Sequence, residues 1–288
     1  MDQNSAQPQT LSVRPATSTS NDVKRTGPKA GRVPHDFTYT PSDDGIDENL
    51  LILLHGLGDT HKPFANLGRS LKLPQTATLS LKATLQIPYL YEPAFQWYPS
   101  FDPLGDLLTN PNPTGAVDAL TQTLTHLVGM CGWPANRIHL FGFAQGGTVA
   151  AETALRWASS ASLQNSATSM PFEDGDPRTV SEPLASIVSI SGPLLSYPTT
   201  ASSSKCTTPV LYFHRSSGSA GDSKVLAVLK KGFSDVREIK MSGVGGEEGM
   251  PKSKDEWEGI MRFWSERLHR RVPGADGGGL YEVMGGSG

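Results

Sequence analysis

Short apolar runs alternate with longer segments of helical periodicity along most of this chain, and that alternation limits the folds open to it. The runs are bounded by glycine, proline or polar residues, which is typical of buried parallel strands. Strands that alternate with helices predict an α/β domain, in which helices cover both faces of a doubly wound, mostly parallel sheet. The predicted strands are Asn49–Leu54, Arg137–Phe141, Ala185–Ile190 and Pro209–Phe213, and the predicted helices are Pro63–Leu71, Thr114–Met130, Gly146–Ser159, Lys224–Lys231 and Asp255–Leu268.

Three segments have the composition of tails or surface loops, not of a packed core. Residues 1–34 are rich in Ser, Thr, Gln and Pro, and such a composition cannot offset the entropy of ordering, so we predict a disordered N-terminal tail. Residues 159–182 have the same character and predict a low-complexity surface insertion within a domain of residues 35–271. The glycine-rich residues 272–288 predict a flexible C-terminal tail.

Charge and cysteine content exclude several classes of function. The formal net charge of -3 gives no electrostatic reason to expect nucleic acid or an anionic membrane as partner. The two cysteines, Cys131 and Cys206, match no disulfide, metal or redox spacing, so we expect no metal and no cofactor. The N-terminal residues have no apolar signal, and no run approaches the roughly 18 apolar residues of a membrane span. We therefore expect a cytoplasmic protein without a membrane span.

One turn has the pattern of a catalytic centre. The run Arg137–Phe141 leads into the residues GFAQGG (142–147) and then into the helical segment TVAAETALRW. A strand, a tight turn and a helix in this order form the context in which G-x-S-x-G is a nucleophile elbow. We expect the side chain of residue 144 to be exposed above the sheet, at a helix N-terminus whose amides favour anions. That residue is Ala144, so the exposed group is a methyl.

Four motifs in the same order resemble the acyl-protein thioesterase and carboxylesterase family of α/β-hydrolases. The residues GWPANRI and GFAQGG (132–138 and 142–147) are similar to the family's G-x-P-x-N-R-I and G-F-S-Q-G-G. The others are LHGLGD (54–59), WYPSFD (97–102) and IVSISGP (187–193), which resemble its L-H-G-L-G-D, W-F-D and V-A-L-S segments. The resemblance spans about residues 49–268 and implies the α/β-hydrolase fold.

The resemblance also implies where a catalytic centre would lie and what it lacks. The family stabilises the oxyanion with the backbone amides of the L-H-G-L leucine and of the residue after the nucleophile, which correspond to Leu57 and Gln145. The nucleophilic serine corresponds to Ala144, which cannot form an acyl intermediate. The oxyanion donors are therefore expected to persist without the nucleophile.

The base and the acid depart from the family as well. The family's histidine lies in G-M-x-H-S before the last helix, and the residues GMPKS (249–253) place Lys252 at the base position. The acid lies in H-G-x-x-D-x-x-V after a strand. Counting forward from His214 gives Gly218 as the acid position, whereas counting back from DSKV (222–225) gives Asp222. Both alignments stay open, and the loss of nucleophile and base together indicates a lineage that gave up the chemistry.

Other side chains could replace the lost ones, although a structural role is expected for each. His214 ends a strand on the catalytic edge and is the best candidate for a replacement base. Ser191 ends a neighbouring strand and is a weaker candidate for a replacement nucleophile. His55 is expected to hold the shape of the L-H-G-L turn. The remaining histidines, for which we expect structural roles, are His35, His61, His126, His139 and His269.

Three hypotheses follow for the function. The first is a catalytically inactive homologue that keeps a pocket or surface for binding a ligand or a protein partner. The second is an active carboxylic-ester or acyl-thioester hydrolase that uses residues outside the family's triad. The third is an interaction or scaffold protein whose tails and insertion recruit partners. A ligand of the cleft is expected to be an acyl compound or fatty carboxylate, because Leu57, Gln145 and Lys252 would all favour its anionic head group.

Overall fold

The computed structural model describes residues 12–15, 25–88, 90–166, 182–196, 204–216, 220–242, 249–271 and 281–284. The chain divides into two compact units. The larger unit is Lys24–Arg270, and the smaller one is made of the two chain ends, Met1–Val23 and Arg271–Gly288. Each unit is described by itself below.

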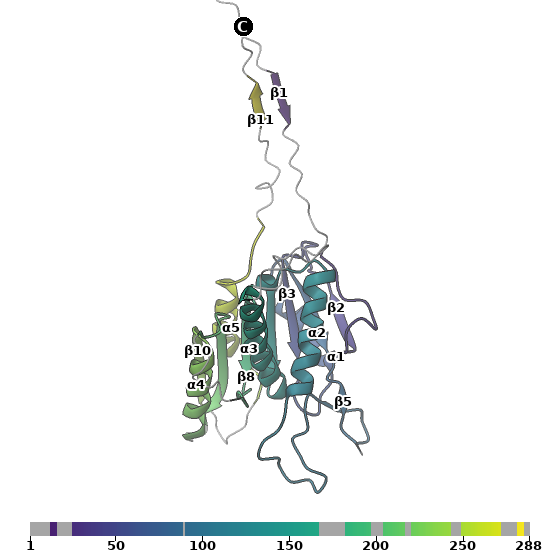
Figure 1. Ribbon diagram of the computed structural model, residues 1–288, viewed down its shortest axis with the longest axis vertical. Helices are drawn as coiled ribbons and strands as arrows, with labels where there is room; N and C mark the ends of the chain where they lie inside the picture. Colours follow the sequence, from purple (N-terminus) through teal and green to yellow (C-terminus); the bar gives the residue numbers. More distant parts are fainter. Residues whose placement is uncertain are drawn as a thin grey trace, which may run out of the picture. The chain divides into compact units, whose positions relative to one another are not determined.

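A seven-stranded sheet forms the centre of the larger unit (Figure 1). Its strand order is β10-β9-β8-β7-β3-β4-β2, and every neighbouring pair is parallel except β2 with β4. This confirms the predicted α/β-hydrolase fold with a mostly parallel sheet. In chain order the strands are β2 (Phe37–Thr40), β3 (Asn49–Leu54), β4 (Thr76–Leu81), β7 (Ile138–Phe143), β8 (Ser186–Ile190), β9 (Val210–Ser216) and β10 (Val236–Ser242).

The order of the strands places a crevice at a defined point of the sheet. From β3 the chain moves outward to β4 and then crosses back to β7, from which it continues to β8, β9 and β10. The direction of winding therefore reverses between β3 and β7, and ligands of such sheets bind at the carboxyl ends of the strands at that point. The last residue of β3, Leu54, pairs with Gly142 near the end of β7. The segments that follow these two strands accordingly begin side by side.

In the described part of the chain, the helices lie on both faces of the sheet (Figure 1). Helices α2, α3 and α4 contribute to the larger buried cluster on one face, and α1 and α5 contribute to the smaller cluster on the other. A short 3-10 helix, η1 (Ala135–Arg137), precedes β7, and a two-stranded hairpin, β5 (Leu85–Gln86) with β6 (Phe95–Gln96), follows β4. The helices are α1 (His61–Leu71), α2 (Thr114–Met130), α3 (Gln145–Ser166), α4 (Ala220–Gly232) and α5 (Lys254–Ser265).

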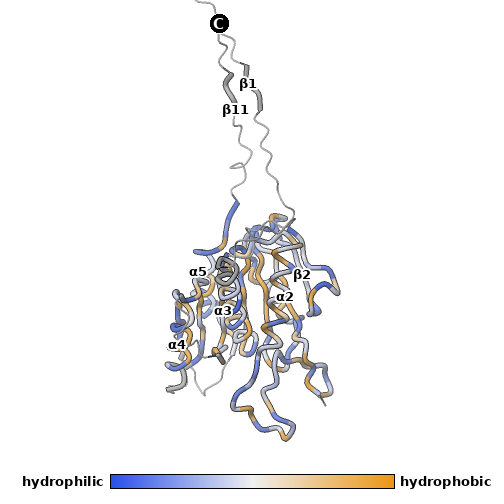
Figure 2. Tube along the Cα trace, viewed as in Figure 1, coloured by the Kyte–Doolittle hydropathy of each residue, from blue (hydrophilic) through white to orange (hydrophobic). Residues whose placement is uncertain are grey.

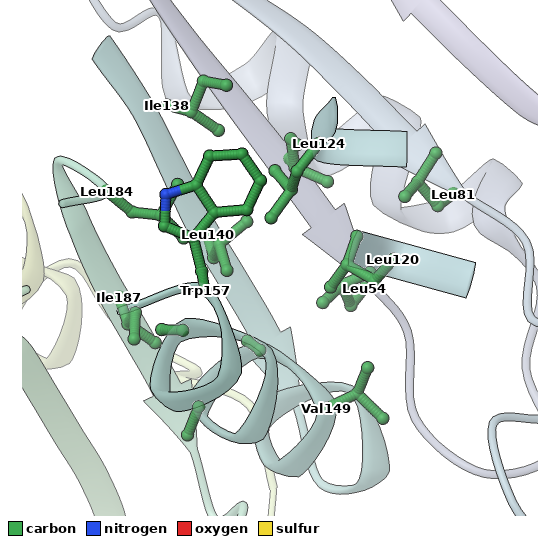
Figure 3. Close-up of a cluster of buried hydrophobic side chains, with 14 of the residues drawn as sticks. Leu54, Leu81, Leu120, Leu124, Ile138, Leu140, Val149, Trp157, Leu184 and Ile187 are labelled. Atoms are coloured by element: carbon green, nitrogen blue, oxygen red, sulfur yellow. The ribbon is translucent and has the colours of Figure 1, made fainter. Parts of the chain in front are cut away.

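The core explains why the central strand is apolar without alternation. Leu50, Ile52 and Leu54 of β3 face the larger cluster, whereas Leu51 and Leu53 face the smaller one. A strand covered on both faces needs apolar residues at every position. Figure 2 shows apolar segments in α2 and along the strands behind it. In Figure 3, Trp157 of α3 lies among Ile138, Leu140, Leu184 and Leu124, at the contact between the sheet and its helices.

The domain begins earlier than predicted. The described part of the predicted tail, residues 25–34, packs on the larger unit. The Arg25 guanidinium lies 2.9 Å from the Glu48 carboxylate, and the Trp133 indole N–H donates to the Thr26 carbonyl at 2.7 Å. Val33 is buried. The prediction of a tail up to residue 34 is therefore wrong for this segment, because a few anchoring contacts can order a chain of polar composition.

The predicted insertion is also shorter than its composition indicated. Helix α3 continues through Ser166, so residues 159–166 extend a helix instead of beginning a loop. The segment SSASLQNS contains neither glycine nor proline, and alanine, leucine and glutamine there are compatible with a helix. Residues 167–181 lie outside the described part of the chain.

The smaller unit contains a second departure from the predicted tails. Strands β1 (Ser12–Pro15) and β11 (Tyr281–Met284) pair in antiparallel fashion, with Val13 opposite Val283. The prediction of two unstructured tails is wrong for these segments, since β-branched residues on opposite strands favour pairing. The rest of both predicted tails, including the terminal GGSG, lies outside the described residues.

Candidate active site

The turn after β7 has the backbone conformation of a nucleophile elbow. Ala144 has a φ of 48°, in the left-handed region that residues with a side chain rarely adopt. Its N–H donates to the Ile190 carbonyl at 2.8 Å, and its own carbonyl accepts from the Thr148 N–H at 3.1 Å. Ala144 is half-buried. The turn thus holds Ala144, whose side chain is a methyl group, in a left-handed conformation directly before α3.

Close packing around this turn requires two of its glycines. A β-carbon on Gly142 would lie 2.3 Å from the carbonyl group of Gly146. A β-carbon on Gly146 would lie 2.4 Å from the Leu54 carbonyl oxygen and 2.6 Å from that of His55. Real β-carbons do not approach backbone atoms so closely, so the turn admits no side chain at either position.

The two predicted oxyanion donors lie on adjacent segments. Gln145 is the first residue of α3, so its amide has no partner within the helix. The turn that contains Leu57 follows β3 and contacts the elbow, since a β-carbon on Gly56 would lie 2.7 Å from the Phe143 ring. Leu57 itself is 39 % exposed. The elbow and this turn therefore pack directly against each other.

The side chain of Gln145 explains why a glutamine follows residue 144. It is buried, and its carbonyl oxygen accepts from the Trp97 N–H at 2.9 Å. Its amide nitrogen donates to the Tyr98 carbonyl at 2.9 Å and to the Ser100 hydroxyl at 2.7 Å. Gln145 thus connects the elbow to the segment WYPSFD and holds that segment beside the candidate site.

His55 has the structural role that the sequence predicted. The Ala83 N–H donates to its Nε2 at 3.0 Å, so the ring proton lies on Nδ1, which donates to the Gly56 carbonyl at 2.7 Å. Burial is the largest of the effects that lower the pKa of His55. A neutral ring with both nitrogens hydrogen-bonded stabilises the turn and cannot act as a general base without breaking these bonds.

Ser191 has a more unusual environment than its sequence context indicated. It has a φ of 53° and is buried, and its hydroxyl has no hydrogen-bond partner among the described residues. The next residue, Gly192, packs on the elbow, since a β-carbon there would lie 2.7 Å from the Ala144 carbonyl oxygen. A buried hydroxyl without a partner is uncommon, and it lies one residue from the elbow contact.

His214, the predicted replacement base, is buried within β9, which continues to Ser216. It therefore does not end the strand as the sequence indicated. Its Nε2 lies 2.8 Å from the Glu238 carboxylate on β10, and its ring stacks on that of Tyr212, with centroids 5.0 Å apart. These contacts orient the ring toward the neighbouring strand.

An ion pair holds the segment that contains Lys252. Lys252 is exposed, and its backbone N–H donates to the Glu256 carboxylate at 2.6 Å. The same carboxylate accepts two bonds from the Arg215 guanidinium, at 2.9 and 2.6 Å, and this guanidinium also donates to the Met250 carbonyl at 3.2 Å. The hydrogen bonds from Arg215 are the main reason that the pKa of Glu256 is lowered.

This cluster was missed from the sequence, although one signal was present. Arg215 occupies the place of the glycine in the family's H-G-x-x-D pattern, and the structure shows what that arginine does. It holds the segment of Met250 and Lys252 against the end of β9. An arginine and a glutamate that are 41 residues apart have no local pattern that would reveal their pairing.

Comparison with known proteins agrees with this geometry. Residues 38–163 match the model of the phospholipase/carboxylesterase family. An uncharacterized hydrolase of Mycosarcoma maydis is 42% identical over 239 residues, which cover 82% of this chain and 82% of that protein. The chain belongs to the phospholipase/carboxylesterase family.

Solved structures similar to this family member show the fold at lower identity. The crystal structure of esterase PE8 superposes with a TM-score of 0.61 at 22% identity and covers 81% of this chain and 99% of its own. That of Zea mays acyl-protein thioesterase 2 gives a TM-score of 0.58 at 19% identity, with the same shares of the two chains. At such identities the likeness supports the fold alone.

The acid position of this family member stays open. Asp222 lies in the first turn of α4, and Gly218 lies outside the described residues.

Within the described ranges, no three histidine, cysteine, aspartate or glutamate side chains are grouped so that they could hold a metal ion. Both cysteines are buried and free. None of the described helices is long and apolar enough to cross a membrane.

Proposed function

We propose that this member of the phospholipase/carboxylesterase family is catalytically inactive as a serine hydrolase and binds a ligand at its elbow. The observation that carries the proposal is the φ of 48° at Ala144. A residue other than glycine in this conformation costs roughly 1–2 kcal/mol, and without a hydroxyl the strained turn has no nucleophile to present. What the turn still provides is the N-terminus of α3, with its unpaired amides.

The ligand that suits these amides has an anionic head group and an apolar tail. Amides at a helix N-terminus favour an anion, and Leu57 would add a second donor together with an exposed apolar side chain. Lys252 supports the proposal less than its sequence position suggested, because its backbone binds the carboxylate of Glu256. We therefore assign the head group to the elbow amides. A fatty carboxylate is the simplest compound of this kind.

The first test is for serine-hydrolase chemistry. The protein at high concentration is incubated with a fluorophosphonate probe and with p-nitrophenyl esters. Loss of the nucleophile or base of a triad lowers kcat on the order of a million-fold, so we expect neither stoichiometric labelling nor turnover. Stoichiometric labelling of any residue in the cleft would contradict catalytic inactivity.

The second test is for the ligand. Calorimetric titration with C8 to C16 carboxylates is compared with titration with the matching alcohols, and binding is expected for the acids alone. Ala144→Asp would place a carboxylate beside the elbow amides and compete with the ligand, whereas Ala144→Asn is of similar size and uncharged. Both residues tolerate the left-handed region. Equal loss of binding in the two variants, or equal binding of acids and alcohols, would contradict the anion site.

One observation favours a second candidate, an active ester or thioester hydrolase that uses other residues. The hydroxyl of Ser191 is buried and has no partner among the described residues, and the residue next to it contacts the elbow. For this candidate the fluorophosphonate probe would label Ser191, and Ser191→Ala would abolish both labelling and turnover. Retained turnover in Ser191→Ala would exclude Ser191 as the nucleophile.

A further inference from the structure

Exposed apolar side chains gather in the loops beside the candidate site. Apart from Met130, every large apolar side chain that is exposed in the described part of the chain lies at Leu57 or within residues 85–108. Figure 2 shows apolar stretches along the loops that project from this end of the domain. The six most exposed large apolar residues of 85–108, with exposed fractions from 41 to 103%, form what we call the apolar rim: Leu85, Leu90, Tyr91, Phe101, Leu104 and Leu107.

The loops that present the apolar rim are internally hydrogen-bonded. The Asp102 carboxylate accepts from the backbone N–H groups of Leu104 and Asp106, at 2.8 and 2.9 Å. The Leu108 N–H donates to the Ser100 carbonyl at 2.9 Å. The backbone is thus held in a turn that leaves Leu104 and Leu107 in solvent, 88 and 75% exposed. Exposed apolar residues on loops with hydrogen-bonded backbones point to an interaction site.

The apolar rim adjoins the elbow. Gln145, the first residue of α3, binds the backbone at Trp97 and Tyr98 and the hydroxyl of Ser100. The hairpin that precedes these residues is joined to the turn after β3, since the Gly58 N–H donates to the Phe95 carbonyl at 2.9 Å. A partner bound to the apolar rim would therefore lie beside the mouth of the candidate site.

The charge of this region indicates the kind of partner. No lysine or arginine occurs between Lys82 and Arg137, whereas Glu92 and Asp106 are exposed within the loops. These loops offer no cluster of basic residues, which is what attracts an anionic bilayer at physiological salt. Apolar side chains interspersed with carboxylates complement a polypeptide that carries apolar side chains among lysines or arginines.

We propose that the apolar rim is a docking surface for a basic, amphipathic polypeptide segment of a partner protein. This inference does not rest on the proposed ligand of the elbow. The free energy of binding to this surface comes from burial of the leucine and aromatic side chains. The exposed Glu92 and Asp106 add specificity and speed of association, as charges at the edge of an interface do.

The probe for this surface is a fluorescent 18-residue peptide of leucine and lysine with the spacing of an amphipathic helix. Its fluorescence anisotropy is measured as the full-length chain is added. Leu104→Ser with Leu107→Ser is expected to weaken binding about 10-fold or more. Met130→Ser is the matched control, because Met130 is 77% exposed at the far end of α2. It is expected to leave the affinity unchanged. Thermal melts of each variant establish that the fold is intact.

A second pair of substitutions tests whether the carboxylates beside the apolar rim contribute to peptide binding. Glu92→Gln with Asp106→Asn is expected to weaken binding several-fold and to reduce its dependence on salt. A peptide with glutamate in place of lysine is expected not to bind. Equal binding of the two peptides, or full affinity in the double leucine variant, would overturn the proposal. Vesicle binding would overturn it as well. This is the case if the chain binds phosphatidylcholine vesicles, with or without phosphatidylserine, through Leu104 and Leu107 and does not bind the lysine peptide.

Discussion

At the ends of β3 and β7 the candidate site is formed by tightly packed backbone turns, whereas at the ends of β9 and β10 it is formed by charged side chains. The first region consists of backbone: the left-handed turn at Ala144, the amide of Gln145 and the turn of Leu57. The second region depended on side chains in the family, and here it contains Lys252 and the pair of Arg215 with Glu256.

This difference shows how the two halves of such a site respond to substitution. Backbone donors survive a change of side chain as long as the close packing around them is kept, as it is at Gly142 and Gly146. A base and an acid have no such protection, because one substitution removes each of them. In this chain Arg215 and Glu256 hold the segment before α5.

The largest effect is expected from breaking the close packing of the first region. Gly146→Ala would place a β-carbon 2.4 Å from the Leu54 carbonyl oxygen, and overpacking against backbone should lower the free energy of unfolding by roughly 3 kcal/mol or more. The matched control is Gly115→Ala in α2, where a β-carbon meets no atom within 4 Å. It should raise the free energy of unfolding by about 0.5 kcal/mol. Chemical denaturation measures both, and a harmless Gly146→Ala would contradict the packing at the elbow.

Substitution in the second region should lower the free energy of unfolding by a smaller amount. The side chains of Arg215 and Glu256 are 9% and 19% exposed. Arg215→Met should therefore lower the free energy of unfolding by about 2 kcal/mol, which lies between the effects of breaking a buried and an exposed ion pair. Arg262→Met breaks an exposed pair on α5, with side chains 71 and 67% exposed, and should cost less than about 0.5 kcal/mol.

The same pair predicts a dependence on pH. Because the pKa of Glu256 is lowered in the folded state from its ordinary 4.5, its stabilisation is complete above that pH and is lost as the pH falls through the lowered value. Denaturation midpoints of wild type and Arg215→Met should therefore converge as the solution is acidified from pH 6 to pH 3. Parallel curves over that range would show that the pair does not contribute through the charge of Glu256.

The sequence predicts the elements of the fold where the pattern of residues is local, and it misses them where distant contacts decide. Strand β3 and helix α2 have the predicted bounds, because one is apolar at every position and the other has a long helical period. Strand β4 was missed because three of its buried residues are polar: Thr76, Thr78 and Ser80. The hydroxyl of Ser80, for example, donates to the His61 carbonyl, a partner that no local pattern reveals.

The site divides similarly into what a motif can and cannot predict. Local motifs placed Ala144, Gln145 and Leu57, since each follows its strand within a few residues. The pair of Arg215 with Glu256 joins distant segments, and the orphan hydroxyl of Ser191 depends on three-dimensional packing. Neither is a property of a short stretch of sequence.

A smaller effect, on activity, tests whether the two regions can be repaired separately. Ala144→Ser restores the hydroxyl on an intact elbow, but a neutral serine needs a base, so we expect no efficient esterase. Adding Lys252→His should raise hydrolysis of p-nitrophenyl acetate about 10-fold over the single variant, below the full contribution of an oriented general base. Ala144→Ser with Lys252→Gln is the control, since it removes the lysine without supplying a base. Ordinary enzyme rates from Ala144→Ser alone would show that a base is already present.

The smallest effect concerns the strain at the elbow itself. Ala144→Gly should relieve the roughly 1–2 kcal/mol cost of a left-handed residue with a side chain and lose about 0.4–1 kcal/mol through the greater entropy of the unfolded chain. The difference is a net stabilisation of about 0.5 kcal/mol, or a rise in Tm of about 1–2 °C for a domain of this size. At Ala158 in the interior of α3, the same substitution should instead destabilise by about 0.5–1 kcal/mol. Opposite signs in calorimetry would show that the elbow is held in its strained conformation by the surrounding packing, whereas equal destabilisation would show that Ala144 is not strained.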